Sequence, residues 1–152
     1  TREERLAHLN LHHYMDSICI YKGSQMGINA IDNIIHSIKG DQSILGELKA
    51  QLTEYRIINN KAKTMLHEYG EKEKDINPMA KISSDISTTV NAIIDSSSSH
   101  IAEMMMQGSA MGIIKIIKAM NEYSDADEKA KDLANKLLDT EQSNFEKMKK
   151  FL

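Results

Sequence analysis

Residues that make turns and disulfides are scarce in this sequence. It contains one proline, no tryptophan, seven glycines and one cysteine in 152 residues. So few turn-forming residues cannot supply the many tight turns of a β-protein, which predicts an all-α domain. The single cysteine, Cys19, excludes an internal disulfide and suits a reducing compartment. Because the sequence carries no secretory signal either, we expect a cytoplasmic protein.

Long apolar runs and a surplus of basic residues are missing as well. No segment approaches the roughly 18 uncharged apolar residues that cross a bilayer, and the formal net charge is −3. A slightly acidic chain has no general attraction to nucleic acid or to an anionic membrane, so we expect neither as a partner. What the chain has instead is methionine, with ten residues, and isoleucine at helical spacing.

Apolar periodicity predicts four long helices within a single domain, residues 1–152. The first two helices form a hairpin over 2–70, and the last two form a hairpin over 96–152. The connection between them, 71–95, has an apolar pattern that predicts an extra helical segment or an extension before the third helix. Whether residues 79–123 form one continuous helix stays open, because a run of four serines interrupts the pattern.

The ends of these helices are predicted at glycines and at short polar residues. Gly40 suits the end of the first helix, and Asp41 suits the N-cap of the second. Gly70 is expected to end the second helix. The N-caps predicted for the third and fourth helices are Ser97 or Ser98 and Asp125, respectively.

Two fragments of the chain read almost alike: residues 23–28 are GSQMGI and residues 108–113 are GSAMGI. Adding 85 to a residue number carries the first fragment onto the second. The same offset joins identical residues of the second and fourth helices, namely Leu48 and Leu133, Leu52 and Leu137, and Asn59 and Asn144. A match that spans a helix, a turn and another helix indicates two pseudo-repeated hairpins, which pack as an antiparallel four-helix bundle.

The middle of this bundle is expected to hold polar side chains. A helical wheel places Ser24 and Ser109 at the centres of the apolar faces of the first and third helices. Antiparallel pairing puts Tyr55 level with Ser24, and Glu141 level with Ser109, with two asparagines about one turn away. The candidate ligand contacts are Ser24, Tyr55, Asn59 and Ser109, and the candidate metal ligands are Glu141 and Asn144. The alternative is that the glycines beside the serines serve only close helix packing.

Two polar groups near the core are candidates for chemistry. A buried Glu141 needs a partner, and Tyr55, Arg56, a buried water or a bound metal all remain open, as does an exposed Glu141. His13 and Asp16 lie three residues apart near the inner face of the first helix. Such a pair can hold a metal, relay a proton or simply satisfy its own hydrogen bonds.

Methionines mark a second apolar face on two helices. Opposite its core face the first helix carries His8, Met15, Cys19 and Met26, and on a matching face the third helix carries His100, Met104 and Met111. Methionine suits adaptable apolar contacts, so we expect these faces to form a homodimer interface. Ordinary partial burial and a copper(I) site built from these soft ligands are the alternatives.

The phrase AEMMMQGSAMGIIKII, followed later by LLDTEQSNFEKMKKFL, resembles small bacterial members of the ferritin-like superfamily of the rubrerythrin or spore-coat type. The resemblance spans most of the chain and implies a ferritin-like four-helix bundle. Catalytic members hold two irons with a glutamate from each of two helices and Glu-x-x-His from each of the other two. This sequence contains no Glu-x-x-His, and the matching stretches read Glu141-Gln-Ser-Asn144 and Arg56-Ile-Ile-Asn59.

Because most of these iron ligands are missing, the resemblance implies a non-catalytic binding or structural protein, and we expect no bound metal. A protein that binds iron, manganese or copper, or an oxidoreductase with an atypical mid-bundle site, is the alternative. A sensor that holds a small apolar ligand beside Ser24 and Ser109 is a third reading of the same residues.

Overall fold

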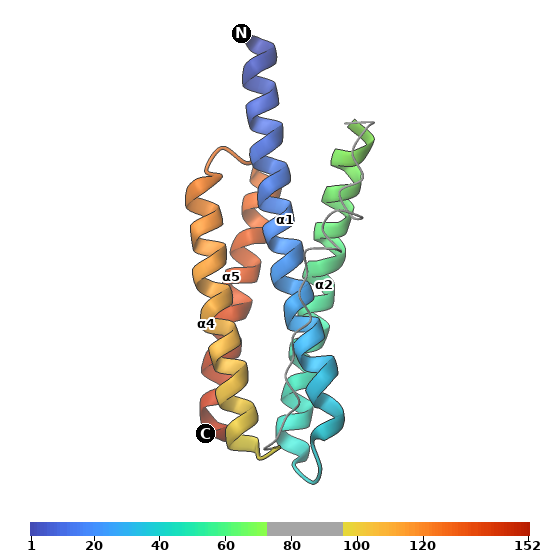
Figure 1. The fold of residues 1–152 in the computed structure, drawn as a ribbon, viewed down its shortest axis with the longest axis vertical. Helices are drawn as coiled ribbons and strands as arrows, with labels where there is room; N and C mark the ends of the chain where they lie inside the picture. Colours follow the sequence, from blue (N-terminus) through green and yellow to red (C-terminus); the bar gives the residue numbers. More distant parts are fainter. Residues whose placement is uncertain (73–95) are drawn as a thin grey trace.

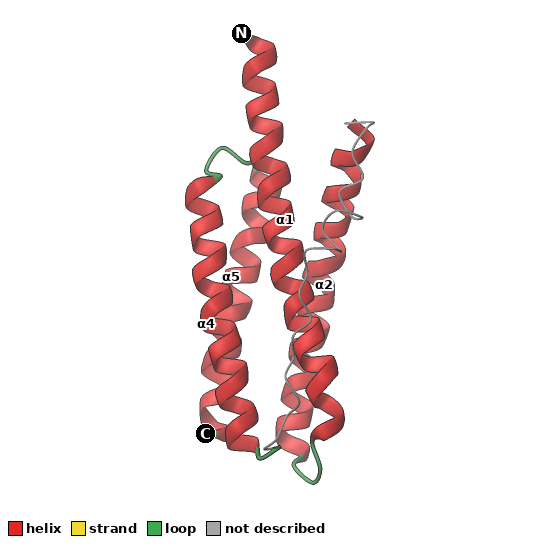
Figure 2. Cartoon of the chain, viewed as in Figure 1, coloured by secondary structure: helices red, strands yellow, loops and turns green. Residues whose placement is uncertain are grey.

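The protein is described by a computed structural model that covers residues 1–72 and 96–152. These residues form four long helices and no strand (Figures 1 and 2). The helices and two short 3-10 turns are α1 (Arg2–Ile34), η1 (Ile35–Ser37), α2 (Gln42–Lys72), α4 (Ser98–Glu122), α5 (Glu128–Met148) and η2 (Lys149–Phe151). The predicted all-α, four-helix architecture is therefore confirmed. The extra segment predicted within 71–95 lies outside the described residues, except for the last two residues of α2.

The helices pair as two hairpins, α1 with α2 and α4 with α5. Helix α1 also contacts both helices of the second hairpin, and α2 contacts α5. One polar contact joins the hairpins at the end where α1 turns into α2: the Ser98 hydroxyl donates to Asp41 Oδ2 at 2.5 Å. Near the opposite end of that hairpin, the rings of Tyr14 and Tyr69 stack with centroids 4.2 Å apart.

Most predicted helix ends are confirmed. The turn after η1 contains Gly40 at a φ of +89°, a left-handed conformation that glycine adopts without strain. Asp41 then caps α2, because its Oδ1 accepts hydrogen bonds from the backbone nitrogens of Ser43 and Ile44, both at 3.1 Å. Ser97 caps α4 by accepting from the His100 nitrogen at 3.3 Å.

Two predicted boundaries are wrong. Helix α2 continues through Gly70 to Lys72, because a single glycine costs a helix only about 1 kcal/mol and does not by itself end it. The N-cap of α5 is Asp127 and not Asp125, since Asp127 Oδ1 accepts from the Ala130 nitrogen at 2.9 Å. Ala126 is buried between these two aspartates, which points Asp125 away from the helix start and toward α1.

The core runs along the inside of all four helices. Its largest fully buried apolar side chains are Ile20, Ile31, Ile34, Ile44, Leu48, Ile58, Leu66, Ile101, Ile116 and Met148. Each such side chain stabilises the fold by about 1.5–3 kcal/mol relative to an exposed one. None of the helices among the described residues is long and apolar enough to cross a membrane.

The first turns of α1 lie outside this core. Figure 1 shows the N-terminal part of α1 extending past the ends of α4 and α5. Leu6 is 49% exposed there, although it lies on the same side of α1 as the buried Ser24, about five turns further along the helix. A residue on the core-facing side of α1 is thus exposed where the neighbouring helices have ended.

Candidate functional site

A groove of about 610 Å³ lies between α1 and α4. Its walls include four glycines, Gly23 and Gly27 from α1 and Gly108 and Gly112 from α4. Three polar residues of the mid-bundle also line it: Tyr55 of α2, Ser109 of α4 and Glu141 of α5. These three are nearly fully buried as residues, so they form the floor of the groove and not its rim. The glycines of the two similar fragments thus open a space above a polar floor.

Gly27 makes room for the ring of Tyr55. A Cβ added at Gly27 would lie 2.7 Å from two ring carbons of Tyr55, closer than real side chains come. The tyrosine is only 2% exposed, and it crosses from α2 to the centre of the bundle. Its ring therefore packs directly on the backbone of α1, which only a glycine at this position permits.

Gly112 makes the equivalent room for the Glu141 carboxylate. A Cβ added at Gly112 would lie 2.5 Å from Glu141 Oε2. Burial raises the pKa of Glu141 from its usual 4.5 to about 7, although a hydrogen bond from Tyr55 partly offsets this shift. Burial also raises the pKa of Tyr55, and the nearby charge of Glu141 raises it further. At pH 7 the Tyr55 phenol is therefore neutral, while the Glu141 carboxyl group is partly ionised.

The predicted mid-bundle group comes together in the structure. The Tyr55 hydroxyl interacts with the side chains of Glu141, Asn144 and Ser109, which come from α5 and α4. Asn144 and Ser109 are buried as well. Of the two side chains left open as partners of Glu141, Tyr55 is in contact with it.

Ser24 and Asn59 form a separate pair about one turn away. Asn59 Nδ2 donates to Ser24 Oγ at 3.1 Å, and Ser24 Oγ donates to the Ile20 carbonyl at 2.9 Å. Ser24 is therefore level with Asn59, while Tyr55 is level with Gly27, so the predicted Ser24–Tyr55 register is wrong. Side chains on a helix lean toward its own N-terminus, and in two antiparallel helices this displaces the contact along both chains.

Arg56 does not lean into the bundle, contrary to one of the predicted options. Its side chain is 58% exposed, and its Nη2 lies 3.7 Å from Asp32 Oδ1 on α1. The offset of 85 that pairs Arg56 with Glu141 in the sequence therefore does not hold at this level of the bundle.

His13 and Asp16 lie far along α1 from the mid-bundle group. The Nδ1 of His13 is 3.1 Å from Asp127 Oδ1, so this side chain lies against the N-cap of α5. Asp16 is fully buried, and its Oδ1 has no hydrogen-bond partner among the described residues. Burial and the nearby Asp127 raise its pKa to about 6, partly offset by Lys131. Both residues thus lie near Asp127 at this end of the bundle.

The predicted methionine faces divide into two environments. Met26 and Met111 are exposed beside the groove, by 45% and 57% respectively. Met15, Cys19 and Met104 are partly buried instead. Burial also raises the pKa of the Cys19 thiol, so this cysteine is not an activated thiolate.

One polar cluster is not predicted from the sequence, although the sequence places His8 on the methionine face of the first helix. His8, His12 and Asp125 each offer a potential ligand atom, and these three atoms lie within 4.8 Å of one another. The spacing of four residues between the histidines is a sequence signal for one helix face. Asp125 gives no such signal, because the sequence marks it as a helix cap.

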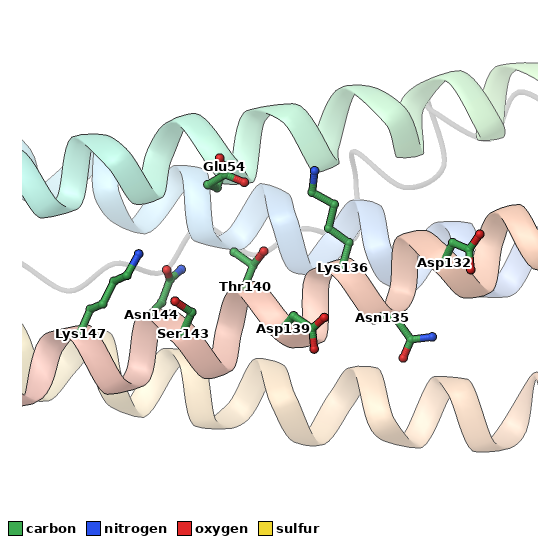
Figure 3. A pocket seen from close by; sticks show the side chains of 9 residues that line it. All are labelled: Glu54, Asp132, Asn135, Lys136, Asp139, Thr140, Ser143, Asn144 and Lys147. Carbon is green, nitrogen blue, oxygen red and sulfur yellow. The ribbon is translucent and has the colours of Figure 1, made fainter.

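A second hollow, of about 440 Å³, follows the outer side of α5 next to α2. Figure 3 shows its side chains, in which acidic groups such as Glu54 and Asp139 alternate with the lysines Lys136 and Lys147. These groups lie spread along the helix and do not converge on one point. A polar surface with both signs of charge favours no particular ligand, so the groove between α1 and α4 is the stronger candidate site.

Comparison with known proteins adds no identification. No family model, no curated protein and no solved structure matches this chain. The function is therefore argued from the geometry of the groove.

Proposed function

We propose that this protein is a non-catalytic, ferritin-like binding bundle that takes a small ligand in the groove between α1 and α4 and assembles as a homodimer. The observation that carries the proposal is the groove floor. There, Tyr55, Ser109 and Glu141 place buried polar groups beneath a largely apolar opening. Ligand sites typically combine a few hundred Å³ of apolar space with a small number of convergent polar groups.

The pattern of burial supports a bundle built from two pseudo-repeated hairpins. In α1 and α4, an offset of 85 carries Ser17, Ile20, Ser24, Ile31 and Ile34 onto the buried residues Ala102, Met105, Ser109, Ile116 and Ala119. In α2 and α5, an offset of 86 carries Ile44, Leu48, Tyr55 and Ala62 onto the buried Ala130, Ala134, Glu141 and Met148. The extra residue agrees with the N-caps, because the same offset carries Asp41 onto Asp127.

The composition of the groove floor supports binding without iron catalysis. A di-iron centre of the ferritin type uses a carboxylate from each of the four helices. Here the buried polar residues of the mid-bundle include Ser24, Asn59, Ser109 and Asn144, and the offset of 86 aligns Tyr55 with Glu141. A single carboxylate beside a phenol, two amides and two hydroxyls is a hydrogen-bonding site.

The chemistry of the floor selects the class of ligand. Once Glu141 has lost its proton, its carboxylate can accept a hydrogen bond or pair with a positively charged group. The ligand must therefore carry a hydrogen-bond donor. The walls contribute methionine, glycine, alanine and leucine, which favour an apolar body. The charged residues that complete the lining are Lys22, Lys115, Lys118 and Glu122. The proposed ligand is therefore a small molecule with an apolar chain and one amine or hydroxyl group.

Calorimetric titration with octylamine, octanol and octanoate at pH 8 tests this proposal. At that pH Glu141 is mostly ionised, so octylamine should bind most tightly and octanoate least. Glu141→Gln should abolish the preference for the amine, because a neutral amide no longer pairs with the ammonium group. Equal binding of octanoate and octylamine to the unaltered protein would contradict the proposal.

Gly108→Leu provides a blocking variant with a matched control. Gly108 lines the groove, and a Cβ added there meets no atom within 4 Å, so leucine should fill the groove without disturbing the core. Gly46 of α2 is exposed and equally open, but it lies outside the groove. We expect Gly108→Leu to abolish octylamine binding and Gly46→Leu to leave it unchanged.

The exposed apolar residues beside the groove support the homodimer. Met26 and Met111 line the groove and are exposed, and α4 carries two more exposed apolar residues, Ile114 and Ile117. Exposed apolar groups of this kind favour an interaction surface. Sedimentation equilibrium should therefore give a dimer that Met111→Lys converts to a monomer, whereas Ile57→Lys on α2, at an exposed apolar residue of the other hairpin, should not change the mass.

A metal-binding protein or oxidoreductase with its site at Glu141 is the second candidate, and the burial of this carboxylate favours it. Metal analysis of protein purified without chelator separates the two functions. Stoichiometric iron, manganese or copper that is lost in Glu141→Ala would support the second candidate. A folded protein whose metal content does not change with Glu141→Ala would support the first.

A further inference from the structure

A cluster of two histidines and an aspartate lies where the N-terminal part of α1 meets the connection between α4 and α5. Figure 1 shows this connection arching over to α1, well away from the middle of the bundle. His8 Nε2 lies 3.0 Å from Asp125 Oδ2, and the rings of His8 and His12 lie 4.1 Å apart between centroids. None of these three residues lines the groove proposed for the small ligand.

The local fold holds these side chains together. His8 and His12 are four residues apart on α1, so both project from the same helix face. Asp125 is positioned by a tight turn in which the Ala126 nitrogen donates to the Tyr123 carbonyl at 3.0 Å. Asp127, two residues later, caps α5 and pairs with His13. The carboxylate is thus fixed between two helix ends and directed at the histidines.

We propose that His8, His12 and Asp125 bind one divalent transition-metal ion of the zinc type. Imidazole nitrogens and a carboxylate oxygen are ligands that zinc binds at about 2.0–2.2 Å, commonly with water in the fourth position. Ligand atoms arranged around such an ion lie about 3.3–3.6 Å apart. The three ligand atoms here are within 4.8 Å of one another, so rotation of the side chains is enough to enclose the ion.

The surroundings of the cluster suit a cation with an open position. His12 packs edge-on against Tyr123, with ring centroids 5.5 Å apart, which limits its rotation. The Nδ1 of His12 is buried and has no hydrogen-bond partner among the described residues, so no existing bond at that nitrogen opposes metal binding. His8 and Asp125 are about half exposed, which leaves a water molecule access to the ion.

Such an ion would join two parts of the chain that are far apart in sequence. Residues 1–9 are exposed, and the first turns of α1 lie beyond most of the core. A metal bound by His8 and Asp125 would fasten this end of α1 to the α4–α5 connection. Slower amide hydrogen exchange in the first turns of α1 is therefore expected in the presence of zinc.

Zinc titration of chelator-treated, dialysed protein tests the site. We expect one zinc ion per chain, and we expect His8→Gln and His12→Gln each to weaken binding by at least about tenfold, since loss of a ligand exceeds the effect of an outer-shell change. His36→Gln is the matched control, because His36 is an exposed histidine at the other end of the same helical segment. Cobalt substitution should give visible absorption bands that His12→Gln reduces and His36→Gln leaves unchanged.

Circular dichroism checks that each variant is folded. Because His8 is half exposed, His8→Gln should fold normally even if His12→Gln does not. Zinc binding that is equally tight in His8→Gln and in unaltered protein would overturn the proposal, as would the absence of zinc binding in folded, unaltered protein. Octylamine binding to His8→Gln should be unchanged, so failure of this metal site is distinguishable from failure of the groove.

Discussion

Gly27 in α1 and Gly112 in α4 occupy the same place in two nearly identical fragments, yet they accommodate different side chains. Gly27 lies against the flat, apolar ring of Tyr55, whereas Gly112 lies against the carboxylate of Glu141. The two fragments therefore share a backbone requirement and differ in the chemistry that fills the space. A repeated motif in this fold specifies where a neighbouring side chain enters the bundle, and the facing helix specifies which side chain that is.

The first glycines of the two fragments also differ. A Cβ at Gly23 would lie 3.1 Å from Leu137 Cδ2, but a Cβ at Gly108 would meet no atom within 4 Å. Helix α1, which contacts all three other helices, is closely packed along its fragment, while α4 faces open space at Gly108. Because of this difference in packing, the open space of the groove lies next to α4.

The largest expected difference between the contact of Gly27 with Tyr55 and that of Gly112 with Glu141 is the effect of pH on stability. The pKa of Glu141 is about 7 in the folded protein against 4.5 ordinarily, so the folded state retains a proton that the unfolded state releases. The resulting stabilisation is complete below pH 4.5 and is lost as the pH rises to about 7, a change of roughly 3 kcal/mol in the free energy of unfolding. Urea unfolding at several pH values should show this decrease.

Glu141→Gln should remove most of that decrease, whereas Tyr55→Phe should retain it and extend it to higher pH. The tyrosine hydrogen bond lowers the pKa of Glu141, so removing it raises the pKa further. Asp16→Asn should remove only a smaller part between pH 3.8 and 6, because the pKa of Asp16 is also raised. A stability that is flat from pH 4.5 to 7 in unaltered protein would show that Glu141 is not buried as a carboxyl group.

Gly27→Ala should have the next largest effect. The added methyl group would meet carbon atoms of a buried ring that cannot move aside without leaving its hydrogen bonds to Glu141 and Ser109. Overpacking of this kind costs about 1–3 kcal/mol, and we expect a loss near 2 kcal/mol in chemical unfolding. Combining Gly27→Ala with Tyr55→Leu should recover part of the loss, and a stability equal to that of the unaltered protein would contradict the close packing.

Gly108→Ala should raise stability by about 0.5–1 kcal/mol. Alanine is the better helix residue, and here its Cβ has free space. Gly46→Ala, at the open position of α2, should give a similar increase and serves as the reference for a glycine without neighbours. A marked decrease for Gly108→Ala alone would mean that the groove is filled in solution by a partner or by another part of the protein.

Gly112→Ala should have the smallest effect, within about 0.5 kcal/mol. The added Cβ meets the end of a side chain, and the Glu141 carboxylate can rotate away from it. The gain in helix propensity and the cost of moving the carboxylate should then nearly cancel. The pKa of Glu141, followed by NMR titration, should shift even where the stability does not, which separates this variant from Gly27→Ala.

The sequence predicts the four helices and the inward direction of Ser24, Ser109, Tyr55 and Glu141, because apolar periodicity and helix caps are local signals. It does not predict the level at which these residues meet. That level depends on how side chains lean along each helix and on which residues form the turn between the helices. As a result, Ser24 faces Asn59 and not Tyr55, which the sequence predicts.

The cluster at His8 shows a second limit. His8 and His12 are related by helical spacing, but Asp125 reaches them only because the buried Ala126 and the cap at Asp127 turn it toward α1. Contacts across 117 positions of sequence depend on such tertiary details, which a single sequence does not encode locally. The same detail explains why Asp125 is not the helix cap that the sequence predicts.

The contact between Tyr55 and Glu141 joins the two hairpins, and this has a kinetic consequence. Contacts within each hairpin are close in sequence and should form quickly, whereas this contact forms only when the hairpins dock. The proton on Glu141 therefore favours docking and has no effect on formation of the separate hairpins. Refolding after a jump to pH 8 should accordingly slow in its docking phase, while the early gain of helical signal keeps its rate.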